Sequence, residues 1–177
     1  MRTVTHDSNE AVLIGGWAFN CALRPRVDTV AGSINGGPLL DRLFRIYFEE
    51  GPFHSIKRFN DWVLAAGVRY RDPIPEEKLQ FLFRDHLPEE GNVYLTHGDL
   101  TLGNILVSGE PGSKHIISVI DWEQAGWCPE YWEYSKLLYG VEYTHPWRSE
   151  GWADKIMTPF VDAFFAYSEY SLWRGVP

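Results

Sequence analysis

The stretch that decides the fold reads Val93-Tyr-Leu-Thr-His97-Gly-Asp99-Leu-Thr-Leu-Gly-Asn104-Ile-Leu-Val107 and, after a turn, Ile116-Ile-Ser-Val-Ile120-Asp121-Trp-Glu-Gln-Ala-Gly126-Trp127. It contains three short runs of aliphatic and β-branched residues, a composition that favours β-strands. Each run lies next to a loop that carries acidic or amide side chains. We therefore expect three strands that present Asp99, Asn104 and Asp121 in the layout of a metal-phosphate site.

The spacing of the polar residues in this stretch matches a known catalytic loop. The run His97-Gly-Asp-Leu, with Asn104 five positions after the aspartate, follows the protein-kinase pattern H-R-D-L-x-x-x-N with glycine in place of arginine. Phosphoryl transfer needs a carboxylate beside the acceptor hydroxyl, and Mg²⁺ needs hard oxygen ligands. We predict Asp99 as the proton acceptor, and Asn104 with Asp121 as the magnesium ligands that bind the metal-nucleotide. We expect His97 to hold the loop through backbone hydrogen bonds.

Three motifs in a fixed order also resemble a known family. They are His97-Gly-Asp-x-x-x-x-Asn-Ile-Leu-Val107, Val119-Ile-Asp-Trp-Glu-x-Ala-Gly126 and Pro129-Glu-Tyr-Trp-Glu-Tyr134. From about Leu23 to Tyr170 the chain resembles the aminoglycoside phosphotransferase-like small-molecule kinases, which share the protein-kinase-like fold and include choline and homoserine kinase relatives. The last two motifs look especially like a branch common in filamentous fungi. The resemblance implies Asp99 as the catalytic aspartate, Asn104 and Asp121 as Mg²⁺ ligands, and ATP as the phosphate donor.

The fold class that the resemblance implies is α+β, namely the C-terminal large lobe of a protein-kinase-like fold. Such a lobe is mostly helical, with a small β insertion that carries the catalytic and metal-binding loops. No G-x-G-x-x-G precedes the catalytic loop, and the first lysine, Lys57, falls on a predicted helix. We therefore expect the N-terminal nucleotide lobe to be absent or vestigial. Residues 1–22 stay unassigned, and residues 23–177 form the predicted large lobe.

Hydrophobic periodicity predicts helices on both sides of the β insertion. Ser55 is the expected N-cap of the first helix, and Pro129 the expected start of the third. The last helix is apolar over more than half of its girth, so we expect it to pack inside a bundle. A strand at Ala11 to Ile14 is one interpretation of the N-terminal text. The helices are expected over residues 55–67, 75–87, 129–141 and 158–172.

Charge and composition exclude several classes of protein. The net charge of −8 argues against a nucleic-acid partner and suits a metal-nucleotide or a cationic small-molecule acceptor. Cys21 and Cys128 lack the spacing of a disulfide framework or a redox motif. No apolar run approaches the roughly 18 residues that span a bilayer, and no signal-peptide pattern opens the chain. We expect a cytoplasmic protein without a membrane or nucleic-acid partner.

Other functions stay open at this point. Without a nucleotide lobe, the chain would be a catalytically inactive remnant or binding module, which would self-associate through the uncovered small-lobe face. A carboxylate-pair hydrolase would use Asp99 with Asp121 or Glu123, although the neighbouring Asn104 argues against it. No diagnostic pattern names the acceptor. The carboxylates at Glu130 and Glu133 either face a cationic acceptor or interact with a helix dipole.

Overall fold

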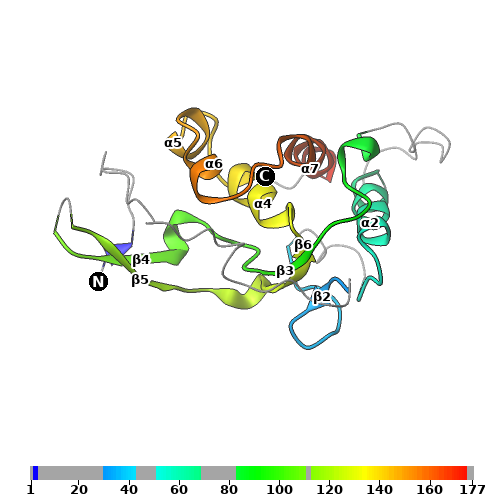
Figure 1. Cartoon of the computed structure of the whole chain (residues 1–177), viewed down its shortest axis with the longest axis horizontal. Helices are drawn as coiled ribbons and strands as arrows, with labels where there is room; N and C mark the ends of the chain where they lie inside the picture. Colours follow the sequence, from blue (N-terminus) through cyan, green and yellow to red (C-terminus); the bar gives the residue numbers. More distant parts are fainter. Residues whose placement is uncertain (1, 4–29, 43–50, 69–82, 111–112, 175–177) are drawn as a thin grey trace.

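The computed structural model describes residues 2–3, 30–42, 51–68, 83–110 and 113–174. These residues form two small antiparallel sheets and a group of helices (Figure 1). This mixture confirms the predicted α+β class. One sheet has the strand order β1-β4-β5 and the other β2-β6-β3. The strands are β1 (Arg2–Thr3), β2 (Gly32–Ser33), β3 (Val93–Thr96), β4 (Ile105–Ser108), β5 (His115–Val119) and β6 (Gly126–Pro129).

The three strands expected from the sequence are β3, β4 and β5, and their positions are confirmed. The strand β6 was not predicted, because Gly126 and Pro129 are residues that strands usually avoid. Its identity comes from pairing, since Leu95 of β3 lies opposite Trp127 of β6. On its other edge β6 pairs with Gly32 and Ser33 of β2. Strand β6 therefore joins β2, which precedes α2 in the chain, to β3, which leads into the loop that carries Asp99.

Two short 3-10 helices lie at the ends of these strands. The first, η2 (Leu102–Asn104), directly precedes β4, and the second, η3 (Trp122–Gln124), follows β5 after Asp121. Residues 97–104 connect β3 to β4, and residues 120–125 connect β5 to β6. The predicted site residues consequently lie at strand ends, as the sequence suggests.

The first predicted helix is confirmed as α2 (Ile56–Val68), where the Ser55 hydroxyl accepts a hydrogen bond from the Arg58 N–H at 3.2 Å. Helix α4 (Trp132–Tyr139) begins later than predicted, because Pro129 belongs to β6 and not to a helix. Between the third and fourth predicted helices lie two short helices, α5 (Pro146–Ser149) and α6 (Trp152–Ile156). The last helix is α7 (Val161–Arg174).

Two expectations about helices need correction. Most of the helix predicted over residues 75–87 lies outside the described residues, and its end is a 3-10 turn, η1 (Arg84–His86), preceded by Phe83 at φ 61°. Helix α7 is not enclosed on all sides, because Val161, Phe165 and Leu172 expose 62%, 44% and 57% of their surface. It packs with one face and leaves the other to solvent. The strand suggested at residues 11–14 lies outside the described residues.

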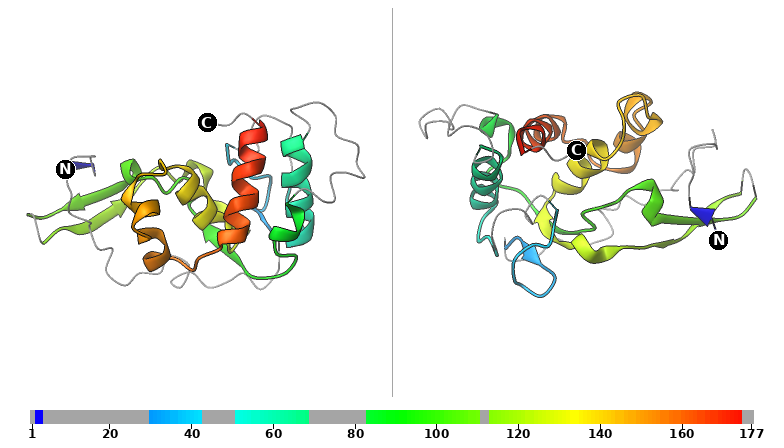
Figure 2. Two further views of the ribbon diagram at one scale, coloured as in Figure 1. Left: turned by 90° about the horizontal axis from the view of Figure 1, so that it is seen from above. Right: turned by 180° about the vertical axis from the view of Figure 1, so that it is seen from behind.

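Trp132 lies at the centre of the larger hydrophobic core. Its side chain is fully buried, with ring centroids 4.8 Å from Phe59 of α2 and 5.1 Å from Tyr167 of α7. Helices α2 and α7 consequently pack side by side, as two views of Figure 2 show. None of the helices in the described ranges is long and apolar enough to cross a bilayer. A second cluster joins Leu100 and β4 to α4 and α6.

Candidate functional site

The loop that carries Asp99 begins with a turn that only glycine accommodates well. After β3 the chain reverses at Gly98, whose φ of 78° lies in the left-handed region. A Cβ atom at this position would lie 2.7 Å from the carbonyl oxygen of Gln124. Glycine in place of the kinase arginine therefore lets the catalytic loop pass close to η3.

His97 is a structural residue, as the sequence predicts. Its side chain is buried, and Nδ1 accepts the Asp99 backbone N–H at 3.2 Å. Nε2 then carries the proton and donates to the Ile120 carbonyl oxygen at 2.9 Å. Burial lowers the pKa of His97 below its ordinary 6.5, although its bond to Ile120 and the nearby aspartates oppose the shift. The neutral ring therefore joins the catalytic loop to the residue just before Asp121.

Asn104 binds the same loop from its other end. The amide Nδ2 donates to the Asp99 carbonyl oxygen at 2.8 Å and lies 3.5 Å from the carboxylate oxygen Oδ2 of Asp99. The backbone carbonyl of Asn104 accepts the Ile120 N–H at 2.9 Å. Asp99, Asn104 and the residue preceding Asp121 are thus connected by hydrogen bonds. These bonds join the chain segments that carry the three predicted site residues.

Asp121 has a backbone conformation that is unusual for a residue with a side chain. Its φ and ψ are 64° and 58°, in the left-handed helical region, and its side chain is exposed. The following Trp122 fixes this turn, because its indole Nε1 donates to the Val119 carbonyl at 2.9 Å. The Trp122 ring also packs on His97, with centroids 4.6 Å apart. Such local strain persists where surrounding contacts impose it, and it is common at functional sites.

The donor chemistry at Asn104 and Asp121 fits Mg²⁺. Because Nδ2 of Asn104 donates to the Asp99 carbonyl oxygen, the amide oxygen Oδ1 is not the atom that holds the loop. With the exposed Asp121 carboxylate, it provides two hard oxygens, and Mg²⁺ usually keeps waters and substrate phosphates as its other ligands. Among the described residues, no group of three or more His, Cys, Asp or Glu side chains is placed to hold a metal ion.

Glu133 holds the Asp99 loop through hydrogen bonds to its backbone, a role that was not predicted from the sequence. Only 4% of its surface is exposed, and its carboxylate accepts the backbone N–H of His97 at 2.5 Å and of Gly98 at 3.3 Å. Burial raises the pKa of Glu133 to about 7, although these backbone bonds and the Lys136 charge favour the ionised form. Glu133 was one of two carboxylates expected from the sequence to face either a cationic acceptor or a helix dipole, and its burial against the loop argues against the acceptor. The motif position alone would not have distinguished the two roles.

A second network beneath the loop was also missed. Lys136 of α4 donates to the fully buried carboxylate of Asp41 at 2.5 Å and to the Gln124 side-chain oxygen at 3.1 Å. Trp132 donates its indole N–H to the same Asp41 carboxylate at 3.1 Å. The next residue, Arg42, reaches the carboxylate of Asp99, with its Nη2 atom 3.6 Å from Oδ2. Asp41 lies more than 90 positions from both Trp132 and Lys136, so no local pattern reveals these contacts.

Comparison with known proteins assigns this chain to a family. A model of the phosphotransferase enzyme family matches residues 45–175, which is more than half of the chain. The chain belongs to the phosphotransferase enzyme family. Searches of curated proteins and of solved structures returned no match. The predicted resemblance is therefore confirmed at the level of the family, and the fungal branch stays a prediction.

Membership in the phosphotransferase enzyme family indicates transfer of phosphate to a small molecule and a kinase-like fold. The matched range contains Asp99, Asn104 and Asp121 together with Glu133 and Lys136. Asp41 and Arg42 precede the matched range, although they contact its catalytic loop and α4. Residues outside the family's matched segment thus contact the loop that carries Asp99 and the helix that packs against it.

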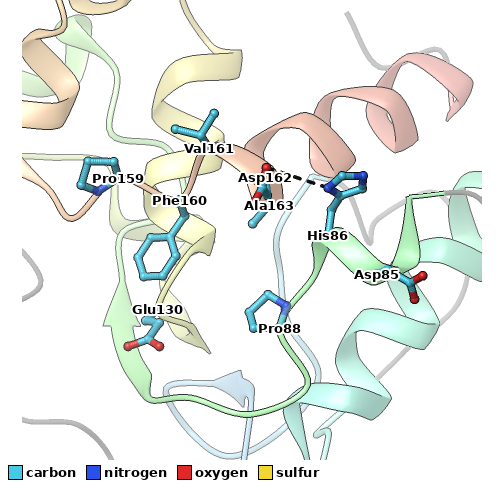
Figure 3. Close-up of a pocket in the computed structure, with 9 residues that line it drawn as sticks. All are labelled: Asp85, His86, Pro88, Glu130, Pro159, Phe160, Val161, Asp162 and Ala163. Atoms are coloured by element: carbon cyan, nitrogen blue, oxygen red, sulfur yellow. Dashed lines mark ion pairs between the residues drawn. The ribbon is translucent and has the colours of Figure 1, made fainter.

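A separate cavity of the phosphotransferase lies between η1 and the start of α7 (Figure 3). It has a volume of about 490 Å³, and none of the three predicted site residues lines it. Figure 3 shows His86 and Asp162 across its rim, with Nδ1 and Oδ1 3.9 Å apart. We locate the candidate site by the chemistry of the catalytic loop and not by this concavity. The cavity is lined by Asp85, His86, Pro88, Glu130, Pro159, Phe160, Val161, Asp162 and Ala163.

Proposed function

We propose that this protein transfers the γ-phosphate of ATP to a hydroxyl group of a small molecule, with Asp99 as the proton acceptor. The observation that carries the proposal is the hydrogen-bonded loop in which Asn104 holds the Asp99 backbone and also pairs with Ile120 next to Asp121. Family membership supports the phosphotransferase chemistry. The identity of the phosphate donor, ATP, and of the metal ion, Mg²⁺, belongs to the proposal.

In the proposed reaction, the acceptor oxygen attacks the γ-phosphorus and a new oxygen–phosphorus bond forms. The bond between the γ-phosphorus and its bridging oxygen breaks, and ADP leaves with that electron pair. The hydroxyl proton moves to the Asp99 carboxylate, whose side chain is 18% exposed and open to an acceptor. Bound Mg²⁺, held by Asn104 and Asp121, would neutralise phosphate charge. His97 and Glu133 keep the Asp99 backbone in place.

Titration calorimetry and ATP hydrolysis test this function, because water serves as an acceptor when the natural one is unidentified. We expect the full chain to bind Mg-ATP at millimolar concentration or below. Asp121→Asn should weaken this binding, whereas Asp99→Asn should retain it and lower the hydrolysis rate roughly a hundredfold or more. Asp162→Asn is the matched control, because Asp162 is an exposed residue of α7. Absence of nucleotide binding by the wild-type chain would refute the proposal.

A specific observation favours a second candidate, a non-catalytic module that pairs with another copy of the chain. Three apolar side chains next to the site are exposed, namely Ile117 at 46%, Ile120 at 40% and Trp122 at 42%. Contiguous exposed apolar surface commonly marks an interaction site. Light scattering would distinguish the two functions. A monomer that hydrolyses ATP excludes the module, and a dimer dissociated by Ile117→Ser without nucleotide binding supports it.

A further inference from the structure

We propose that Arg42 is a catalytic residue that binds the phosphoryl group during transfer; this inference rests on the function proposed above. The catalytic loop carries Gly98 where the protein-kinase pattern has arginine. In the folded chain the Arg42 guanidinium lies beside the loop, with Nη2 3.6 Å from Oδ2 of Asp99. Transfer of a phosphoryl group is accelerated by positive charge at its oxygens. Arg42 brings that charge from another part of the chain.

The backbone at Arg42 is fixed, so the guanidinium starts from a defined position. The Arg42 N–H donates to the side-chain oxygen of Gln124 at 2.9 Å, and Gln124 is only 2% exposed. The preceding Asp41 carboxylate is buried between Lys136 and Trp132. Two consecutive residues are therefore anchored beneath the catalytic loop.

The guanidinium lies on the side of Asp99 where the transferred group must pass. The carboxylate oxygen Oδ2 that faces Arg42 is also the oxygen 3.5 Å from the Asn104 amide. In phosphoryl transfer the moving group lies between the proton acceptor and the metal ligands. Because Asn104 is the candidate metal ligand next to Asp99, Arg42 borders the same space.

The contact with Asp99 leaves Arg42 free to bind phosphate. The Arg42 side chain is 61% exposed, and exposed ion pairs contribute little to stability. A phosphoryl group offers several charged oxygens to the planar guanidinium, which binds phosphate well in a bidentate arrangement. The arriving phosphate would therefore compete successfully for Arg42. Asp99 would then be available to accept the hydroxyl proton.

The test compares Arg42→Gln and Arg42→Lys with wild type by calorimetry and ATP hydrolysis. We expect Arg42→Gln to lower kcat for hydrolysis roughly a hundredfold. It should also reduce the preference for Mg-ATP over Mg-ADP about tenfold, since only ATP carries the γ-phosphate. Arg42→Lys should recover part of both. Arg58→Gln on α2 makes the same charge change at an exposed position and should leave both values unchanged.

Two further comparisons separate a direct phosphate contact from an effect through Asp99. Asp99→Asn should keep the preference for ATP, whereas adding Arg42→Gln to it should remove the preference. If wild type binds and hydrolyses ATP while Arg42→Gln matches it in rate and in preference, the inference is wrong and the proposed function stands. A faster Arg42→Gln enzyme would also overturn it, because the arginine would then be an inhibitor of Asp99. A wild-type chain that binds no nucleotide refutes the proposed function itself.

Discussion

The buried carboxylate of Glu133, in the first turn of α4, accepts the backbone N–H of His97 at 2.5 Å. This bond fixes the loop two residues before Asp99 to a helix that is itself packed in the core. Only 4% of the Glu133 surface is exposed to water, so ionising its carboxylate in the folded chain costs free energy. The loop is therefore held by a titratable anchor.

Replacing Glu133 with glutamine should change how stability depends on pH. The pKa of Glu133 is about 7 in the folded chain against an ordinary 4.5. Between these values the unfolded chain loses the proton that the folded chain keeps, so stability falls as pH rises from about 4.5 to about 7. Glutamine removes this dependence. Urea unfolding at several pH values should show the wild type losing up to about 3 kcal/mol relative to Glu133→Gln over this range.

Glu123→Gln is the control for that measurement. Glu123 is an exposed carboxylate of η3, so its neutralisation should leave the wild-type pH dependence of unfolding intact. Parallel stability curves for wild type and Glu133→Gln would mean that Glu133 does not titrate differently on folding. The anchoring role would then rest on hydrogen bonding alone.

Alanine at Gly98 should disrupt the catalytic turn, whereas alanine at Gly103 should be tolerated. The first has a φ of 78° and would place a Cβ atom 2.7 Å from the Gln124 carbonyl. The second meets only the Thr101 hydroxyl, at 3.8 Å. We expect Gly98→Ala to cost about 1–3 kcal/mol of unfolding free energy, and Gly103→Ala less than about 1 kcal/mol. Equal melting temperatures for the two variants would contradict the assigned backbone conformation.

Removing the charge of Lys136 should weaken the buried network around Asp41. The Asp41 side chain is 1% exposed, and Lys136→Met removes a cation that donates to its carboxylate. A loss of about 3–5 kcal/mol is expected for breaking a buried pair by one partner. Adding Asp41→Asn should recover part of this loss, because the remaining amide is neutral. Chemical denaturation of both single variants and the double variant measures the coupling, and simple additivity would exclude the pair.

Phenylalanine at His97 should remove the hydrogen bonds that join the Asp99 loop to Ile120 while keeping the edge-to-face ring contact with Trp122. The substitution removes the bonds to the Asp99 N–H and the Ile120 carbonyl, leaving both groups unsatisfied. We expect a loss of about 1–3 kcal/mol in stability and a lower kcat, with a smaller change in nucleotide affinity. His115→Phe, at an exposed position of β5, provides the control. Unchanged kcat in His97→Phe would show that Asp99 is positioned without the ring.

The order of the site motifs was readable from sequence because the elements concerned are local. Each strand of the predicted trio is a short aliphatic run, and Asp99 lies close to Gly98 and Asn104 along the chain. Hydrogen bonds over two to five residues then complete the loop. The same reasoning located α2, where a serine cap and a regular apolar stripe agree.

The misplaced elements have a common cause, which is competition from distant partners. Pro129 suggests the start of a helix, yet it ends β6 because Val93 of β3 lies opposite it. The apolar girth of α7 suggests enclosure, yet Phe165 is 44% exposed, with ring contacts to Phe83 and His86. Local residue preferences do not show which face of a helix or strand will pack against a distant segment.

The sequence by itself determined the chemistry available to this phosphotransferase: a carboxylate at Asp99, and an amide and a second carboxylate at Asn104 and Asp121, in a spacing typical of phosphoryl transfer. Tertiary structure alone decided what supports and completes that set. Glu133 lies 36 positions from His97, and Arg42 lies far before Asp99. Burial gives the first its raised pKa, and anchoring of the backbone gives the second its place. Both effects depend on packing between distant segments, which residue spacing does not encode.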